Sequence, residues 1–265
     1  MSTLIYKDLT NREYHARPEI SSTAVKTVAK QSVAHWIGAE RKETPSMQMG
    51  SAVHSLCLEP HLNEVVRGPE SRRGNAWKDA VAKATLANQD AIVLTEADYD
   101  KADAIATSAR NHPVMAQYLD DMHSRVEMSV ILNDPDADIP IRVRPDLYNA
   151  STGILIDLKT TQDASPRGFG SQAYKYGYHI QAFMYMRALE LEGLKVNGFA
   201  FLAVETVAPY ATCLHWVSPD LLKLGALDYE RAMEQIKLYQ DTGIASTGWP
   251  DEVTLMPPSW AMQEF

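Results

Sequence analysis

The chain has 265 residues, of which 45% are apolar and 22% are charged, a composition that is typical of folded globular proteins and excludes a disordered or fibrous chain. Its 25 basic and 34 acidic residues give a net charge of −9, which argues against a nucleic-acid partner without excluding a localised basic face, because phosphate binding favours basic surfaces. Its two cysteines are too few for a disulfide framework, a four-cysteine zinc site or an iron–sulfur cluster held by cysteines alone.

The sequence contains no apolar run of about 18 residues, the length that a membrane-spanning helix needs. Its start, MSTLIYKDLTNREYHARPE, lacks the basic residues and apolar stretch of a secretory signal. We therefore expect a cytoplasmic protein without membrane contact. The length and the absence of internal repeats favour one domain over residues 1–265, with a mainly helical portion at 1–120 and a sheet core at 121–265.

Apolar residues recur at spacings of three and four in the first third of the chain, which predicts helices there. The expected helices run from Ser21 or Ser22 to about Gly38, over residues 47–58, onward from near Asn75, and from Thr95 to about Arg110. Thr95 and Asp98 resemble a capping box, with Asp in place of the usual Glu. The glycines and the proline of VRGPESRRGNAWK predict a loop before the helix near Asn75.

From Arg125 onward the pattern changes to short segments that are rich in β-branched residues and separated by turn-forming stretches. RVEMSVIL, IRVRPDLY and ILIDLK predict an antiparallel meander of three strands. A long helix over residues 170–192, two further strands in VNGFAFLAVE and YATCLHWV, and a helix over residues 218–239 are expected to follow. This order predicts an α/β (α+β) fold with a mixed central sheet flanked by helices.

Two aspartates and a lysine are expected to converge on the last two strands of the meander. Asp157 and Lys159 are one residue apart on a strand, so their side chains leave the same face. A hairpin centred near Ser151 places Asp146 almost opposite Asp157, where cross-strand neighbours are about 5 Å apart. Two aspartates this close repel each other unless a cation lies between them, and their oxygens suit Mg²⁺ or Mn²⁺. Such a site can activate water for phosphodiester hydrolysis, with the lysine orienting the water or offsetting charge.

The spacing of these residues matches a nuclease motif. Pro145-Asp146, followed ten residues later by Asp157-Leu158-Lys159, fits the PD-(D/E)xK pattern in the strand-turn-strand setting that this pattern requires. An Asp-x-Lys pair on a strand is common by chance, so the surrounding motif carries the assignment. The apolar residues ILI before Asp157 also indicate a buried central strand that delivers polar groups at its end.

A third element lies on the helix that follows the hairpin. Gln181 and Tyr185 form a Gln-x-x-x-Tyr motif, and Tyr178 lies one turn earlier on the same helical face. The alternative for the tyrosines is packing in the core beside Phe183 and Met184.

Together the motifs resemble the RecB-like branch of the PD-(D/E)xK superfamily, in which a histidine, a Pro-Asp, a (D/E)xK and a QxxxY helix occur in that order. His54 in GSAVHSLCLEP takes the place of the histidine. Within that branch the chain resembles the RecE-type phage and prophage exonucleases (exonuclease VIII-like), and more distantly phage lambda exonuclease. Other segments that carry the resemblance are ISSTAVKTVAKQSVAHW, SRRGNAWK, RVRPDLYN, IDLKTT and YGYHIQAFMY.

The resemblance implies a restriction-endonuclease-like core and processive, Mg²⁺-dependent 5′-to-3′ digestion of linear double-stranded DNA, which leaves a 3′ single-stranded overhang for a partner annealing protein. It also implies a phage or prophage origin and a ring-shaped homo-oligomer, a trimer or tetramer, around DNA. Direction, processivity and ring formation come from the resemblance alone. Larger members carry a long additional N-terminal region, so this chain is expected to be a minimal, phage-type version.

Roles can then be assigned to individual residues. The expected metal ligands are His54, Asp146, Asp157 and the backbone carbonyl of Leu158. The expected catalytic residues are Asp146, Asp157, Lys159 and Gln181. The expected DNA-binding residues are Arg72, Arg73 and Lys78 in the basic loop, for which a solvated loop is the alternative, together with Tyr178 and Tyr185. Glu127 is expected to face solvent rather than to add a carboxylate to the site.

Two other functions fit the same motifs. One is a nuclease-fold protein that binds DNA or a partner without cleaving, against which the intact Asp146, Asp157 and Lys159 argue. The other is a sequence-specific endonuclease, because the same metal core serves both activities. An iron–sulfur nuclease of this superfamily is set aside, since two cysteines cannot supply four ligands.

Overall fold

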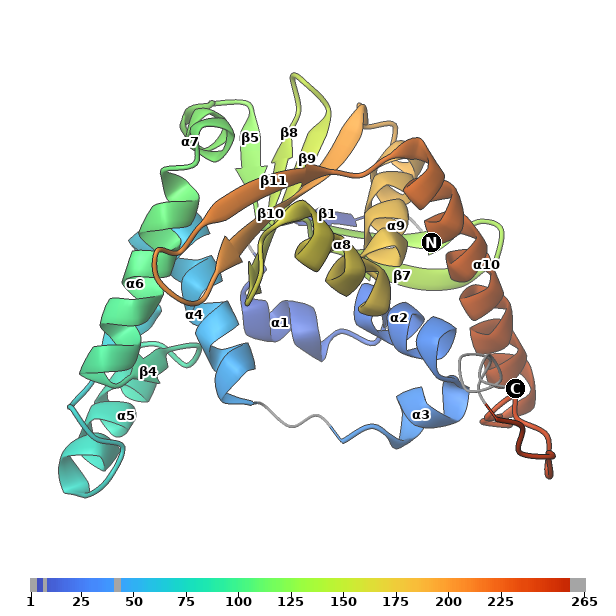
Figure 1. Ribbon diagram of the computed structural model, residues 1–265, viewed down its shortest axis with the longest axis horizontal. Coiled ribbons are helices and arrows are strands. Elements are labelled where there is room, and N and C mark those ends of the chain that lie inside the picture. Colours follow the sequence, from blue (N-terminus) through green and yellow to red (C-terminus); the bar gives the residue numbers. More distant parts are fainter. Residues whose placement is uncertain (1–3, 7–8, 41–43, 258–265) are drawn as a thin grey trace.

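The computed structural model describes residues 4–6, 9–40 and 44–257, in which β-sheets of five, four and two strands lie among helices (Figure 1). The strands are β1 (Leu4–Tyr6), β2 (Ile20–Ser21), β3 (Val65–Arg67), β4 (Ile92–Leu94), β5 (Ser124–Val126), β6 (Ser129–Asp134), β7 (Ile139–Val143), β8 (Leu147–Asn149), β9 (Ile154–Thr161), β10 (Gly198–Glu205) and β11 (Thr212–Trp216). The helices are α1 (Asn11–Ala16), α2 (Ser22–Lys30), α3 (Val33–Gly38), α4 (Pro45–Leu58), the 3-10 helix η1 (Pro60–Leu62), α5 (Asn75–Ala87), α6 (Glu96–Arg110), α7 (Pro113–Asp120), α8 (Pro166–Lys175), α9 (Tyr178–Leu191) and α10 (Pro219–Thr242).

The larger sheet has five strands in the order β11-β10-β9-β8-β5. It is mixed, because β9 runs parallel to β10 and antiparallel to β8, while β10 runs antiparallel to β11. A four-stranded sheet has the order β1-β6-β7-β2, and β3 forms a separate parallel pair with β4. The predicted fold class, a mixed central sheet flanked by helices, is confirmed.

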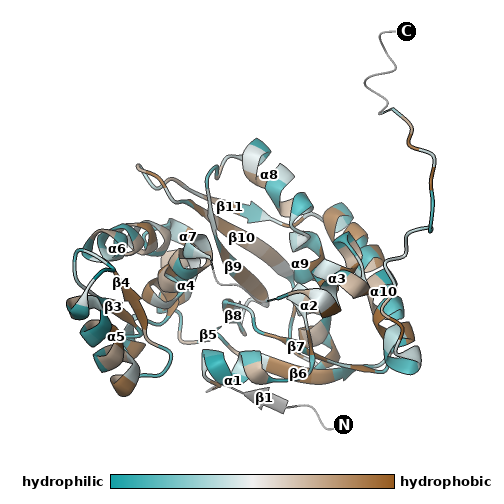
Figure 2. Ribbon diagram, turned by 90° about the horizontal axis from the view of Figure 1, so that it is seen from below, coloured by the Kyte–Doolittle hydropathy of each residue, from teal (hydrophilic) through white to brown (hydrophobic). Residues whose placement is uncertain are grey.

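Both faces of the larger sheet are buried. Leu155 and Phe201 belong to a core cluster that also contains residues of α2, α9 and α10. Ile156, Leu158 and Leu202 belong to a second cluster, with residues of α4 and α6. Because alternate residues of a strand point to opposite faces, this division explains why β10 and the first three residues of β9 are almost continuously apolar (Figure 2).

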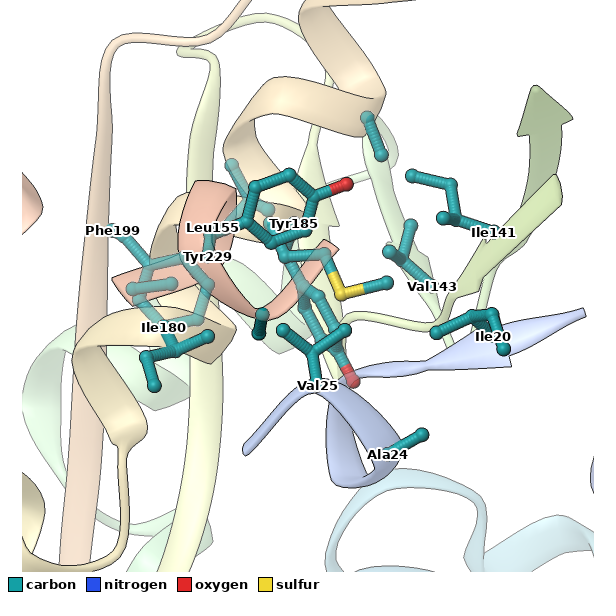
Figure 3. Close-up of a cluster of buried hydrophobic side chains, with 14 of the residues drawn as sticks. Ile20, Ala24, Val25, Ile141, Val143, Leu155, Ile180, Tyr185, Phe199 and Tyr229 are labelled. Carbon is teal, nitrogen blue, oxygen red and sulfur yellow. The ribbon is translucent and has the colours of Figure 1, made fainter. Parts of the chain in front are cut away.

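The first of these clusters joins the two sheets (Figure 3). It brings side chains of the larger sheet together with side chains of β7 in the smaller one. The residues labelled in the close-up are Ile20, Ala24, Val25, Ile141, Val143, Leu155, Ile180, Tyr185, Phe199 and Tyr229. Packing of α2 and α9 in this cluster fixes both helices against β9.

The predicted meander of three strands is wrong in detail, because two of its segments are each divided between the two sheets. RVEMSVIL is interrupted between β5 and β6 at Glu127, whose φ of 51° is unusual for a residue other than glycine. IRVRPDLY is interrupted between β7 and β8, just before Leu147. β6 pairs with β7 in one sheet and β5 with β8 in the other. The two breaks adjoin, since the Glu127 N–H donates to the Asp146 carbonyl at 3.1 Å.

Two predicted long helices are each two helices. The helix expected from Ser21 or Ser22 to Gly38 is divided into α2 and α3, and Ser32 caps α3 by accepting from the His35 N–H. The helix expected over residues 170–192 is divided into α8 and α9 at Gly177, whose φ of 69° is in the left-handed region that glycine adopts without strain. By contrast, α4, α6 and α10 lie close to where the sequence predicts helices.

The first 120 residues, for which the sequence predicts a mainly helical portion, also contain the short strands β1 to β4. Strands β1 and β2 form the two edges of the four-stranded sheet, although their short lengths give little periodicity to detect. Within residues 9–40 and 44–257, no helix is both long and apolar enough to cross a membrane.

Candidate active site

The β8–β9 hairpin places the two predicted aspartates side by side. Leu147 pairs with Ile156 in the antiparallel ladder, so the next position along each strand sets Asp146 against Asp157. Asp146 and Asp157 are 7% and 1% exposed. The Leu158 N–H donates to Asp146 Oδ2 at 2.6 Å, which fixes the carboxylate of Asp146 against β9.

The carboxylate of Asp157 is held by two further predicted residues. Lys159 Nζ forms an ion pair with Asp157 Oδ2, and Gln181 Nε2 donates to Asp157 Oδ1 at 2.6 Å. The Lys159 ammonium also lies 5.1 Å from the centre of the Tyr178 ring. The first turn of α9 therefore lies beside Asp157 and Lys159 of β9, and Asp157, Lys159 and Gln181 form one hydrogen-bonded group.

On the other side of Asp146, α4 brings in the predicted histidine. His54 Nδ1 lies 3.3 Å from Asp146 Oδ2, and 27% of the His54 side chain is exposed. His54 thus reaches the carboxylate cluster from the solvent-facing side, which leaves room for a further ligand or a substrate.

Glu127 is a member of this cluster, so the expectation that it faces solvent is wrong. One ligand atom each from His54, Glu127 and Asp146 lie within 4.8 Å of one another. Glu127 Oε2 is 3.7 Å from Arg144 Nε, and Arg144 is itself 8% exposed. The positive φ of Glu127 directs the chain out of one sheet and into the other at this point. The pattern of RVEMSVIL does not signal this role, because Glu127 enters the site through the backbone break between β5 and β6.

The geometry divides the expected ligands into two groups. His54 and Asp146 lie with Glu127, whereas Asp157 is bonded to Lys159 and Gln181. Direct metal binding by Asp157 and by the Leu158 carbonyl therefore remains a prediction, which would require Asp157 Oδ2 to exchange Lys159 for the metal.

The carboxylates are held in electrostatically unfavourable positions. Burial, together with the charge of Asp157, raises the pKa of Asp146 to about 6, although His54 and Lys159 oppose this shift. Burial and the charge of Asp146 likewise raise the pKa of Glu127 well above its ordinary value. Burial would lower the pKa of Lys159, but the charges of Asp157 and Asp146 raise it instead. The cluster carries more negative charge than its own cations offset.

These donors fit a divalent cation. Two carboxylates and an imidazole converge at His54, Glu127 and Asp146, and oxygen-rich sets of this kind suit Mg²⁺ or Mn²⁺. A cation there would relieve the repulsion that raises the pKa of both acids. The ammonium of Lys159 is paired with Asp157 and its charge also acts on Asp146, so it can contact an anionic group of a substrate.

The basic loop before α5 is exposed but partly neutralised. Arg72 pairs with Asp98 at 3.0 Å and lies 5.6 Å from the centre of the Trp77 ring. Arg73 and Lys78 are exposed, and within the described residues neither forms an ion pair with a carboxylate. Of the three predicted phosphate contacts, Arg73 and Lys78 are the more available.

We expect replacement of Arg73 by alanine to weaken DNA binding and to flatten its salt dependence by a slope of about one, the value for one lost phosphate contact. Arg72→Ala should have a smaller effect, because Asp98 already neutralises Arg72. Anisotropy titrations of labelled duplex DNA over a range of salt concentrations measure both quantities. If Arg73→Ala kept the wild-type affinity and salt slope, the loop would be a solvated surface that does not contact DNA.

The two tyrosines have different surroundings. Tyr178 is half-buried beside the ammonium of Lys159, at the edge of the site. Tyr185 is 7% exposed and packs against Phe199 in the core, where DNA does not reach it. The DNA contact expected of Tyr185 is therefore wrong, because one helical turn beyond Gln181 the side chains of α9 lie in the core cluster.

Comparisons with known proteins agree with this architecture. Residues 6–247 match the family described as "PDDEXK-like domain of unknown function (DUF3799)". A search of curated proteins finds no match. A candidate exonuclease from Eubacterium rectale has a similar solved structure, with a TM-score of 0.64 and 14% identity over 97% of this chain and 98% of that one. A phage-related exonuclease from Haemophilus somnus 129PT gives a TM-score of 0.38 and 13% identity over 85% and 96% of the two chains. The predicted PD-(D/E)xK core is confirmed as the fold.

Proposed function

We propose that this chain, which belongs to the PDDEXK-like family matched over residues 6–247, is a metal-dependent deoxyribonuclease that digests linear double-stranded DNA from its ends. The observation that carries the proposal is the convergence of His54, Glu127 and Asp146 within 4.8 Å, beside Asp157 and Lys159. A carboxylate cluster with an adjoining ammonium is the arrangement that metal-assisted phosphodiester hydrolysis requires.

Different residues of the chain would have different roles in the reaction. His54, Glu127 and Asp146 would hold Mg²⁺ or Mn²⁺, which when bound lowers the pKa of a coordinated water and polarises a phosphoryl oxygen. Lys159, which is paired with Asp157, would orient the attacking water and offset the charge that develops on the phosphate. Gln181 holds the carboxylate of Asp157 in position.

Exonuclease rather than endonuclease activity is supported by the resemblance of the ordered motifs to RecE-type enzymes. The candidate exonuclease from Eubacterium rectale also shares the fold over nearly the whole chain. The proposal has three further parts, which rest on the resemblance alone. They are processive 5′-to-3′ digestion that leaves 3′ overhangs, a ring-shaped homo-oligomer and a partner annealing protein.

Matched linear and covalently closed circular duplexes of one sequence test the proposal. With Mg²⁺ we expect loss of the linear DNA only, and EDTA should abolish this loss because the carboxylate cluster needs a cation. Electrophoresis over time, with end-labelled strands to report direction, provides the measurement. Cleavage of the circle would identify an endonuclease, and binding without loss of either DNA would identify a non-cleaving protein.

A further inference from the structure

We propose that Lys26 is a second phosphate-binding residue of the active site, which contacts the phosphate next to the scissile one on the bound DNA strand. The inference rests on the proposed nuclease function and extends it to a residue on α2. The motif pattern of the active site does not include this residue.

Lys26 is connected to the catalytic aspartate through one side chain. Its Nζ donates to Gln181 Oε1 at 3.3 Å, and Gln181 Nε2 donates in turn to Asp157 Oδ1 at 2.6 Å. The Lys26 ammonium lies 5.6 Å from the centre of the Tyr178 ring, which the Lys159 ammonium also approaches. Two ammonium groups, those of Lys26 and Lys159, therefore lie beside the same aromatic ring.

The charge of Lys26 lacks a carboxylate partner among the described residues, unlike that of its neighbours. Lys159 is paired with Asp157, and Lys30, one turn further along α2, is paired with Asp228 at 3.7 Å. Lys26 is half-buried, and an ammonium in such a place is stabilised by an opposite charge. A DNA phosphate is the anion that a nuclease would bring to this position.

The surroundings of Lys26 keep its ammonium directed at the site. A side chain at Gly177 would begin 3.2 Å from Lys26 Cγ, so the glycine leaves space for the lysine stem against the start of α9. Burial and the positive charge of Lys159 lower the pKa of Lys26 to about 8, and the negative charge of Asp157 offsets this shift only in part. A phosphate beside Lys26 would add a second opposite charge.

The position of Gln181 indicates which phosphate Lys26 contacts. Because the Gln181 amide lies between Lys26 and Asp157, the Lys26 ammonium is one side chain removed from the carboxylates. Lys159 contacts Asp157 directly and is therefore the group for the scissile phosphate. Lys26 would then hold the next phosphate along the DNA strand.

Three substitutions separate phosphate binding from a purely positioning role. Lys26→Met removes the charge and the hydrogen bond to Gln181, Lys26→Gln keeps a hydrogen-bond donor without the charge, and Lys26→Arg keeps both. Lys30→Met is the matched control, because Lys30 lies on the same helix but is paired with Asp228. DNA affinity is measured by anisotropy over a range of salt with Ca²⁺ in place of Mg²⁺, and cleavage of linear DNA is measured with Mg²⁺.

We expect Lys26→Met and Lys26→Gln to bind DNA about tenfold more weakly, the loss of one charge-assisted contact, with a salt slope reduced by about one. Lys26→Arg and Lys30→Met should bind as the wild type does, and thermal denaturation should show that all four variants are folded. Wild-type affinity and slope in Lys26→Gln, with slower cleavage, would overturn the proposal and leave Lys26 as a positioning residue for Gln181. A wild-type protein that binds DNA without cleaving it would refute the nuclease function, while the salt slopes would still decide the role of Lys26.

Discussion

We expect Lys159→Met to lower the rate of DNA cleavage by a factor on the order of 10²–10³, because the substitution removes a group proposed to stabilise charge in the transition state. Metal and DNA binding should change much less, because the cluster of His54, Glu127 and Asp146 does not include the lysine. The Lys159 ammonium forms an ion pair with Asp157 Oδ2. The charges of Asp157 and Asp146 raise the pKa of Lys159 despite its burial, so the side chain is protonated at neutral pH. A fixed positive charge beside these carboxylates would act on the phosphate, where negative charge develops in the proposed reaction.

Single-turnover cleavage of linear DNA, measured beside a calorimetric titration of metal, separates the two effects. Lys223→Met serves as the control, because Lys223 is an exposed lysine that pairs only with Asp220 on α10. A Lys159→Met protein that cleaves at the wild-type rate would contradict the assigned role, even if the protein proved to be a nuclease.

The fold could be predicted from the sequence as far as local pattern determines it. Alternation and β-branched residues located most of the strand segments, and the turn between β8 and β9 set Asp146 opposite Asp157. The division of two strand segments between two sheets could not be predicted, because it depends on which distant strands pair. Gly177 divides α8 from α9 for a similar reason, since a glycine within a helical pattern does not by itself mark the end of a helix.

Residues of the candidate site could be predicted where they share one strand or one helix. They were missed where segments far apart in the sequence are brought together by packing. Asp157 and Lys159 share a strand face, so a period of two was enough to place them together. Glu127 reached the site only through a left-handed backbone break that RVEMSVIL does not reveal. Lys26 contacts Gln181 across 155 residues of sequence, through the packing of α2 on α9. Tyr185 was wrongly included in the site. The helical period predicted that it shares a face with Gln181 but could not predict that its side chain is buried in the core.

Asp146→Asn is expected to abolish metal-dependent cleavage and to weaken metal binding, while the metal-free protein stays as stable as the wild type or becomes more stable. The asparagine side-chain oxygen can still accept the Leu158 N–H, so the hairpin keeps its hydrogen bond. The charge that is lost is an unfavourable one: burial and Asp157 raise the pKa of Asp146 to about 6 in the folded protein. Removing that charge relieves repulsion at neutral pH, but it also removes an anionic ligand from the cluster with His54 and Glu127.

Thermal denaturation at neutral pH in EDTA, and again with Mg²⁺, tests both halves of this expectation. Ligand binding to the folded state raises the melting temperature, so the wild type should gain stability from Mg²⁺ and Asp146→Asn should gain little. Asp220→Asn, which changes an exposed carboxylate on α10, should gain as the wild type does. If Asp146→Asn were clearly less stable than the wild type in EDTA, the carboxylate would be a structural anchor of the hairpin. If it kept the full gain from Mg²⁺, the metal would be held elsewhere, and the site built on His54, Glu127 and Asp146 would be wrong.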